Sequence, residues 1–192
     1  MKTKFLISMV FTIIVAGLFF LEQSIAKSNH VSLHSPDSHI SMDAEILGIL
    51  ITLNKNEISA ANLALKKTDI VSIKEHAQML KKDHKKNLDD TLKLSIKMAL
   101  PTKESAEERA LKEAGQIEMK HLSSLKDKKF DEFYIDAMIK DHKQAIKMLD
   151  DNLLKNVTHS TLRTFLLATK TYLISHLKQA QKIRFDRFIK SA

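Results

Sequence analysis

The 192-residue sequence contains no cysteine, no tryptophan, only three glycines and only two prolines. The absence of cysteine excludes a disulfide scaffold, a thiol nucleophile, a cysteine-ligated zinc or iron–sulfur centre and a lipoprotein anchor acylated on cysteine. The scarcity of glycine and proline excludes a β-sandwich or β-barrel, because such folds need a turn roughly every ten residues. With 44% hydrophobic and 28% charged residues, the composition predicts an all-α globular fold.

The N-terminal 26 residues have the parts of a secretory signal peptide. Two lysines lie in the first four residues, an apolar run extends from Phe5 to Leu21, and Ser24 and Ala26 provide the small residues that a signal peptidase requires. We therefore expect cleavage after Ala26 and a periplasmic or secreted protein. The alternative is an uncleaved segment, residues 5–21, that anchors the chain in the inner membrane.

Four segments of the remaining chain have apolar residues at spacings of three and four, which is typical of amphipathic helices. They cover residues 42–67, 69–98, 130–155 and 161–190, within a single domain expected over 41–192. The links between the first two and the last two segments are short enough only for antiparallel neighbours. The spacing therefore predicts an antiparallel four-helix bundle.

The segments around these helices are polar. A leader over 27–40, containing His30, His34 and His39, is expected to be flexible, and Ser41 is expected to cap the first helix. The charged connector of residues 102–129 is expected to hold a short extra helix from Glu104 to Ala114 that stops at Gly115.

Each predicted long helix has one ionisable residue in the middle of its apolar face. These residues are Glu57, His84, His142 and His176. Three imidazoles and a carboxylate are a sensible set of ligands for zinc, copper or iron. A metal-free network of hydrogen bonds between the same side chains is the alternative, and the sequence leaves both open.

Lys-Asp-His-Lys occurs twice, at residues 82–85 and 140–143. Asp83 and Asp141 are expected on the rim of the bundle, paired with lysines or accepting a hydrogen bond from a histidine. The one Glu-x-x-His, Glu118–His121, lies in the charged connector, so the paired Glu-x-x-His of ferritin-like di-iron sites is missing.

The formal charge of +8 favours anionic partners such as acidic components of the cell envelope. The lysines are spread over every predicted helix, aromatic residues make up 6%, and the export signal removes the chain from the genome, so nucleic acid is not an expected partner. No phosphate-binding glycine loop and no nucleophile motif occurs in the sequence.

Several short motifs in the predicted helices resemble those of one protein family. They are Asn54-x-x-Glu57-Ile58, His76-Ala77, Asp83-His84, Phe130-Asp131-x-x-Tyr134-Ile135-x-x-Met138, Asp141-His142 and His176-Leu177-x-x-Ala180. With them the chain resembles the domain of unknown function 4142, which comprises secreted bacterial proteins with a ferritin-like helical bundle. The resemblance implies that fold and export but no particular activity. The family habitually has Phe-Ala where this chain has His76-Ala77.

Together these features predict an exported, non-enzymatic helical-bundle protein with a binding role in the envelope. A transition metal bound at the middle of the bundle is one candidate ligand. Two alternatives stay open. The first is a metal-dependent redox enzyme that uses Glu57, His84, His142 and His176. The second is a structural protein that docks on an anionic envelope polymer, and contact with a membrane is expected only if the signal segment is retained.

Overall fold

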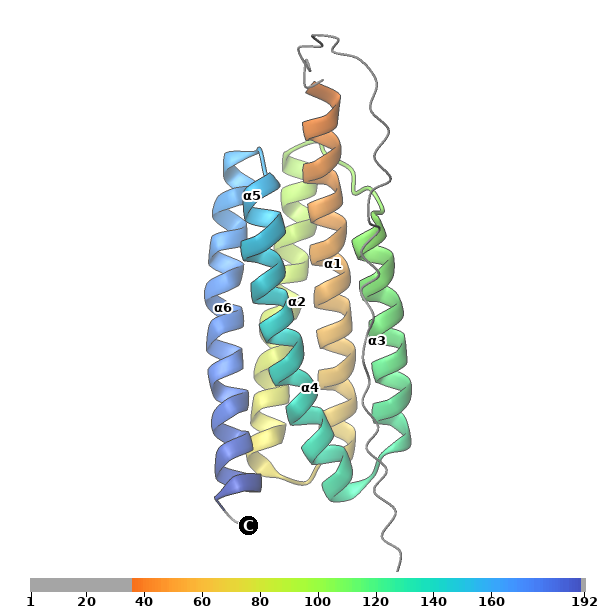
Figure 1. Ribbon diagram of the computed structural model, residues 1–192, viewed down its shortest axis with the longest axis vertical. Coiled ribbons are helices and arrows are strands. Elements are labelled where there is room, and N and C mark those ends of the chain that lie inside the picture. The colour runs from red at the N-terminus through yellow and green to blue at the C-terminus, as the bar shows by residue number, and fades with distance from the viewer. Residues whose placement is uncertain (1–35, 191–192) are drawn as a thin grey trace, which may run out of the picture. The chain divides into compact units, whose positions relative to one another are not determined.

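A computed structural model describes residues 36–190, which form helices α1 (Pro36–Lys67), α2 (Val71–Lys97), α3 (Ala106–Ser124), α4 (Asp127–Met148), α5 (Leu154–Asn156) and α6 (Ser160–Arg184) (Figure 1). Two π-helical turns, Leu149–Leu153 and Phe185–Ile189, join α4 to α5 and follow α6. This part of the chain contains no β-strand, which confirms the all-α prediction. The predicted signal segment and the first nine residues of the leader lie outside it.

The boundaries of the four long predicted helices are close to those observed, except at the start of α1. This helix begins at Pro36, six residues before the predicted position, so Ser41 lies inside the helix and its predicted capping role is wrong. Proline suits the first position of a helix, because its φ angle is already helical and its missing N–H has no partner to lose there.

The extra helix of the connector is longer than predicted. Ser105 caps α3 by accepting a hydrogen bond from the Glu108 amide at 3.0 Å, and the helix then continues through Gly115 to Ser124. The prediction that Gly115 ends this helix is therefore wrong. A Cβ atom at Gly115 would lie 2.5 Å from the Asn56 side chain, so glycine serves here to let α3 approach α1.

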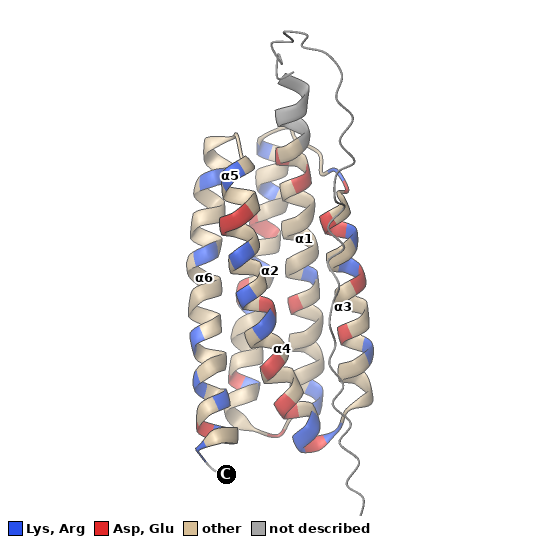
Figure 2. Ribbon diagram, viewed as in Figure 1, with Lys and Arg blue, Asp and Glu red and all other residues tan. Residues whose placement is uncertain are grey.

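The helices pack side by side along their lengths (Figure 1). The main packed pairs are α1 with α2, α4 with α6, α1 with α3, and α2 with α6. Figure 2 shows lysine and arginine distributed along all the long helices, and acidic residues on each of them except α6. None of the helices within residues 36–190 has the length and apolarity needed to cross a membrane.

The apolar core of the described chain consists of two clusters. One contains Leu47 and Leu50 of α1 together with Leu149 and Leu166, and the other contains Ile73, Leu80, Phe130 and Met138. On α1, α2, α4 and α6, buried polar residues occupy the positions between the two clusters: Asn54, Glu57, His84, His142, Thr169 and His176. Burying polar groups is unfavourable unless they have partners, so this polar layer is the part of the core whose contacts need an explanation.

Candidate metal centre

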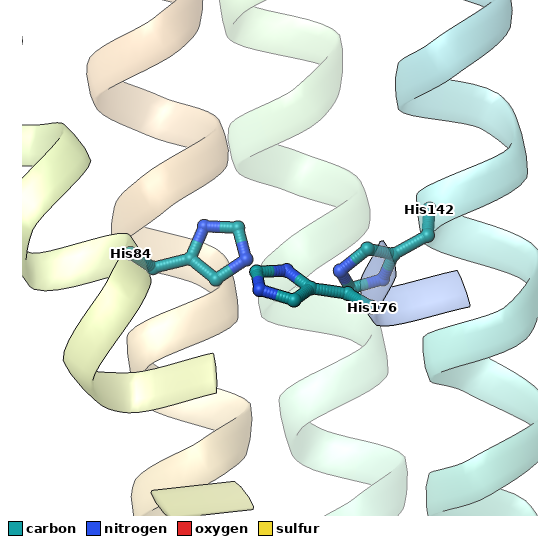
Figure 3. A group of neighbouring side chains, drawn as sticks. All are labelled: His84, His142 and His176. Carbon is teal, nitrogen blue, oxygen red and sulfur yellow. The ribbon is translucent and has the colours of Figure 1, made fainter. Parts of the chain in front are cut away.

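Three histidine rings meet in the polar layer, one each from α2, α4 and α6 (Figure 3). The ring centroids of His84, His142 and His176 lie 5.3 to 5.8 Å apart, and one nitrogen of each ring lies within 4.8 Å of one nitrogen of each of the others. All three side chains are at least 95% buried. The structure thus brings together three of the four residues that the sequence singled out.

Each of the three rings is fixed by a hydrogen bond from one of its nitrogens. His84 Nδ1 lies 2.9 Å from the Asn54 side-chain oxygen, and His142 Nδ1 lies 2.8 Å from the Met138 carbonyl. His176 Nε2 lies 3.0 Å from the Asp83 carboxylate. The Met138 carbonyl and the Asp83 carboxylate can only accept a hydrogen bond. The Asn54 oxygen also accepts, because Asn54 uses its amide nitrogen to donate to Leu50 and Asn87. The hydrogen of each neutral imidazole is therefore on the nitrogen that faces its partner.

The second nitrogen of each ring carries a lone pair and has no hydrogen-bond partner among the described residues. These atoms are Nε2 of His84, Nε2 of His142 and Nδ1 of His176. Burial lowers the pKa of all three imidazoles, that of His142 to about 3, so protonation does not supply the missing donors near neutral pH. Three buried lone pairs without a donor are costly in a metal-free protein, whereas a metal ion would satisfy all three at once.

The same arrangement is the one in which proteins hold metal-binding histidines. A histidine ligand usually donates its other N–H to a carboxylate, a backbone carbonyl or a water, which fixes the ring and increases its basicity. His176 has a carboxylate as its partner and His142 a backbone carbonyl, while the partner of His84 is the side-chain oxygen of Asn54. Zinc–nitrogen bonds of about 2.0–2.1 Å would require the three rings to move inward.

Glu57, the fourth residue singled out by the sequence, lies beside this cluster rather than in it. Its Oε1 atom is 3.8 Å from His142 Nδ1, which is the nitrogen already bonded to Met138, and its Oε2 atom has no partner among the described residues. Burial first, and repulsion from Asp141 and Glu118 second, raises the pKa of Glu57 well above its usual value. The carboxyl group therefore favours its neutral form in the folded protein.

The two aspartates of the repeated motif have different surroundings. Asp83 accepts a hydrogen bond from His176, which is one of the two roles expected for it. Asp141 instead lies 3.8 Å from Lys140 and is hydrogen-bonded to Glu118. That bond places Glu118 against α4, and burial raises its pKa to about 8. Glu118 is thus half-buried, while His121 of the same Glu-x-x-His is exposed as expected.

A cavity of about 30 Å³ adjoins the histidine cluster. His84, His176 and Glu57 line it, together with the polar side chains Asp83, Asn54, Asn87 and Thr169 and the apolar side chains Leu50, Leu53, Ala145, Leu149 and Leu173. Asn54 donates to Asn87 at 2.8 Å, and Asn87 donates to the Thr169 hydroxyl at 2.9 Å. Neither Asn87 nor Thr169 was predicted as a site residue, because their contacts depend on the packing of α2 against α1 and α6.

A fourth buried histidine lies close to the cluster on α2. His76 is 2% exposed, its Nε2 atom lies 3.4 Å from the His176 carbonyl oxygen, and its Nδ1 atom has no partner in the described part of the chain. Burial lowers its pKa from 6.5 to about 4. His76 is therefore neutral in the folded protein at pH values at which it is protonated in the unfolded chain.

Replacing His76 by phenylalanine, the residue that the resembled family has at this position, should stabilise the protein, and more so in acid. Because the folded pKa lies below the unfolded one, the unfolded chain binds more protons between about pH 6.5 and 4, and the stability of the wild type is lost as the pH falls through this window. The advantage of His76→Phe over the wild type should therefore grow by about 2 kcal/mol between pH 7 and pH 5. Urea denaturation at several pH values measures this difference, and an advantage that stays constant with pH would refute it.

Truncating a histidine of the cluster should also destabilise the metal-free protein. His142 is fully buried, so His142→Ala leaves a cavity in the core and should lower the free energy of unfolding by about 1–3 kcal/mol in the presence of a chelator. His121 is exposed and contacts only the edge of the Phe133 ring among aromatic residues, so His121→Ala should cost at most about 1 kcal/mol. Equal urea midpoints for the two variants would contradict the described packing of α4.

Comparison with known protein families identifies one match. The family model for the domain of unknown function DUF4142 matches residues 31–183, which include all three histidines of the cluster. No curated protein and no solved structure matches the chain. The chain belongs to the DUF4142 family.

Proposed function

We propose that this protein is exported and binds one transition-metal ion through His84, His142 and His176. The observation that carries the proposal is the meeting of three buried histidine rings, each of which has one nitrogen without a hydrogen-bond donor among the described residues. The role is one of binding, without catalysis, in the cell envelope.

The donor atoms determine which metals are expected. Neutral imidazole nitrogens suit zinc, copper and iron, whereas magnesium and calcium prefer oxygen ligands. Because burial already keeps His84, His142 and His176 neutral, no proton needs to leave these rings when the metal binds near neutral pH. Zinc and copper are the ions expected to bind most tightly.

The helical framework is proposed to be an antiparallel, ferritin-like four-helix bundle of α1, α2, α4 and α6, with α3 packed outside it on α1. The packing of α1 with α2, of α4 with α6 and of α2 with α6 supports this arrangement. Proteins with ferritin-like bundles hold metals in the core, on side chains that project inward from facing helices, and His84, His142 and His176 project in this way (Figure 3).

Export rests on the N-terminal sequence alone. The basic start, the apolar run from Phe5 to Leu21 and the small residues before Lys27 support a cleaved signal peptide and a periplasmic location. N-terminal sequencing of the protein purified from its host envelope should give Lys27 as the first residue. A chain that still begins at Met1 and fractionates with membranes would instead support an anchor.

Metal content after equilibrium dialysis tests the binding proposal. The wild type should retain one zinc or copper ion per chain, and His142→Ala and His176→Ala should retain none, whereas His121→Ala serves as a control that keeps the ion. A triple variant of His30, His34 and His39 separates the core site from the histidines of the leader. Loss of the metal in this triple variant, with retention in His142→Ala, would assign binding to the leader and refute the proposed site.

A further inference from the structure

The cavity beside the histidine cluster is large enough to hold a small molecule. Its volume of about 30 Å³ exceeds the roughly 10–15 Å³ that a single water needs. His84 and His176 form part of its wall, so a metal held by the three rings would be next to this space. The cavity is therefore suited to a molecule of two or three heavy atoms.

Three protein ligands leave a coordination position unused. Structural zinc sites are usually closed by four protein ligands, and sites with three retain a position for a water or a substrate. Glu57 is the nearest candidate for a fourth ligand, but its closest approach to the cluster is 3.8 Å from the ring nitrogen of His142 that is bonded to Met138. Glu57 as it lies in the described structure therefore does not complete the set of ligands.

The charge of a bound divalent ion would favour an anion at that position, and it would act against the carboxyl groups of Asp83 and Glu57, which also line the cavity. Three neutral imidazoles do not offset the charge of a divalent ion in a buried layer, so an added negative ligand reduces the unfavourable burial of charge. The Thr169 hydroxyl lines the cavity, accepts a hydrogen bond from Asn87 and donates none to the described residues. It therefore offers a donor to an anion in the cavity.

We propose that the metal centre has an open coordination position facing this cavity, and that a small anion of two or three atoms binds the metal there. This inference rests on the proposed metal-binding function and extends it, because it makes the centre a receptor for a second ligand instead of a closed structural site.

Azide is a suitable probe, because it is a linear anion of three atoms that gives a charge-transfer absorption band when it binds copper(II). The copper-loaded wild type should develop this band with a stoichiometry of one azide per copper and should keep its copper. Thr169→Val, which removes the hydroxyl donor, should weaken the azide affinity about threefold to tenfold.

A variant that fills the cavity provides the decisive comparison. Ala145 lines the cavity and is 6% exposed, so Ala145→Leu places three further carbon atoms in this region. This variant should bind one copper as the wild type does and lose at least tenfold in azide affinity. Ala110→Leu, on the exposed side of α3, is the matched control and should behave as the wild type. If Ala145→Leu fails to fold, the smaller Ala145→Val is used with the same expectation of weaker azide binding.

Copper content is measured before azide is added, so failure of the metal site and failure of the open position are distinguished. A copper-loaded wild type without an azide band would overturn the inference while the metal site stands. An azide band that appears only in Glu57→Ala would overturn it as well, because Glu57 would then be the fourth ligand. Equal azide affinities of the wild type and Ala145→Leu would also refute binding in the cavity, and absence of copper from the wild type would refute both proposals.

Discussion

Zinc at a hundredfold excess over its dissociation constant is expected to raise the free energy of unfolding by about 2.7 kcal/mol. The ion binds the folded protein, in which His84, His142 and His176 face one another, far better than the unfolded chain, in which they are 58 and 34 residues apart along the sequence. Copper should have a comparable effect, whereas magnesium at the same concentration should have little, because the three ligands are nitrogen atoms.

Urea denaturation with and without the metal measures this shift. His176→Ala and His142→Ala should abolish it, while His121→Ala, which alters an exposed histidine of α3, should retain it. A shift of the same size in His176→Ala would show that zinc binds elsewhere. The absence of a shift with every transition metal tested would favour a metal-free polar layer.

Removal of the Asp43 carboxylate should be among the most destabilising single changes outside the metal centre. Asp43 is 3% exposed in α1 and accepts three hydrogen bonds, from the Thr158 amide at 2.9 Å, the Thr158 hydroxyl at 2.7 Å and the His159 amide at 2.9 Å. These bonds fix the start of α6 against α1. Because hydrogen bonds to a charged group contribute more than neutral ones, Asp43→Ala should lower the free energy of unfolding by about 3 kcal/mol.

Two variants serve as controls for this prediction in the same urea titration. Asp43→Asn keeps an acceptor oxygen and should lose less stability than Asp43→Ala. Glu45, two residues further along α1, forms an ion pair at 3.0 Å with the exposed side chain of Lys103, and Glu45→Ala should cost no more than about 1 kcal/mol. A loss in Asp43→Ala no larger than that in Glu45→Ala would contradict the described contact.

The sequence allowed the helices and the convergence of the histidines to be predicted, because both follow from the spacing of apolar residues. The side chain of the first helix that His84 contacts is Asn54, 2.9 Å from the ring, and not the predicted ligand Glu57. The partner of His176 was only one of two possibilities for Asp83, because the rotation of α2 against α6 decides whether that carboxylate meets a lysine or an imidazole.

Other features depend on contacts that spacing along the chain does not specify. Asp43 lies near the start of the first predicted helix, but its partners Thr158 and His159 lie 115 and 116 residues further along the chain. Gly115 was interpreted as a helix end, because glycine is common there, and its actual role depends on the position of Asn56 on another helix. Which nitrogen of each histidine remains free likewise depends on the partner of the other nitrogen.

X-ray absorption spectroscopy of the zinc-loaded protein tests the proposed metal centre most directly, because it counts the imidazole ligands of the bound ion. The proposed site predicts three imidazole nitrogens at about 2.0–2.1 Å and one further light atom in a four-coordinate shell. A shell of oxygen atoms with one imidazole or none would contradict binding by His84, His142 and His176.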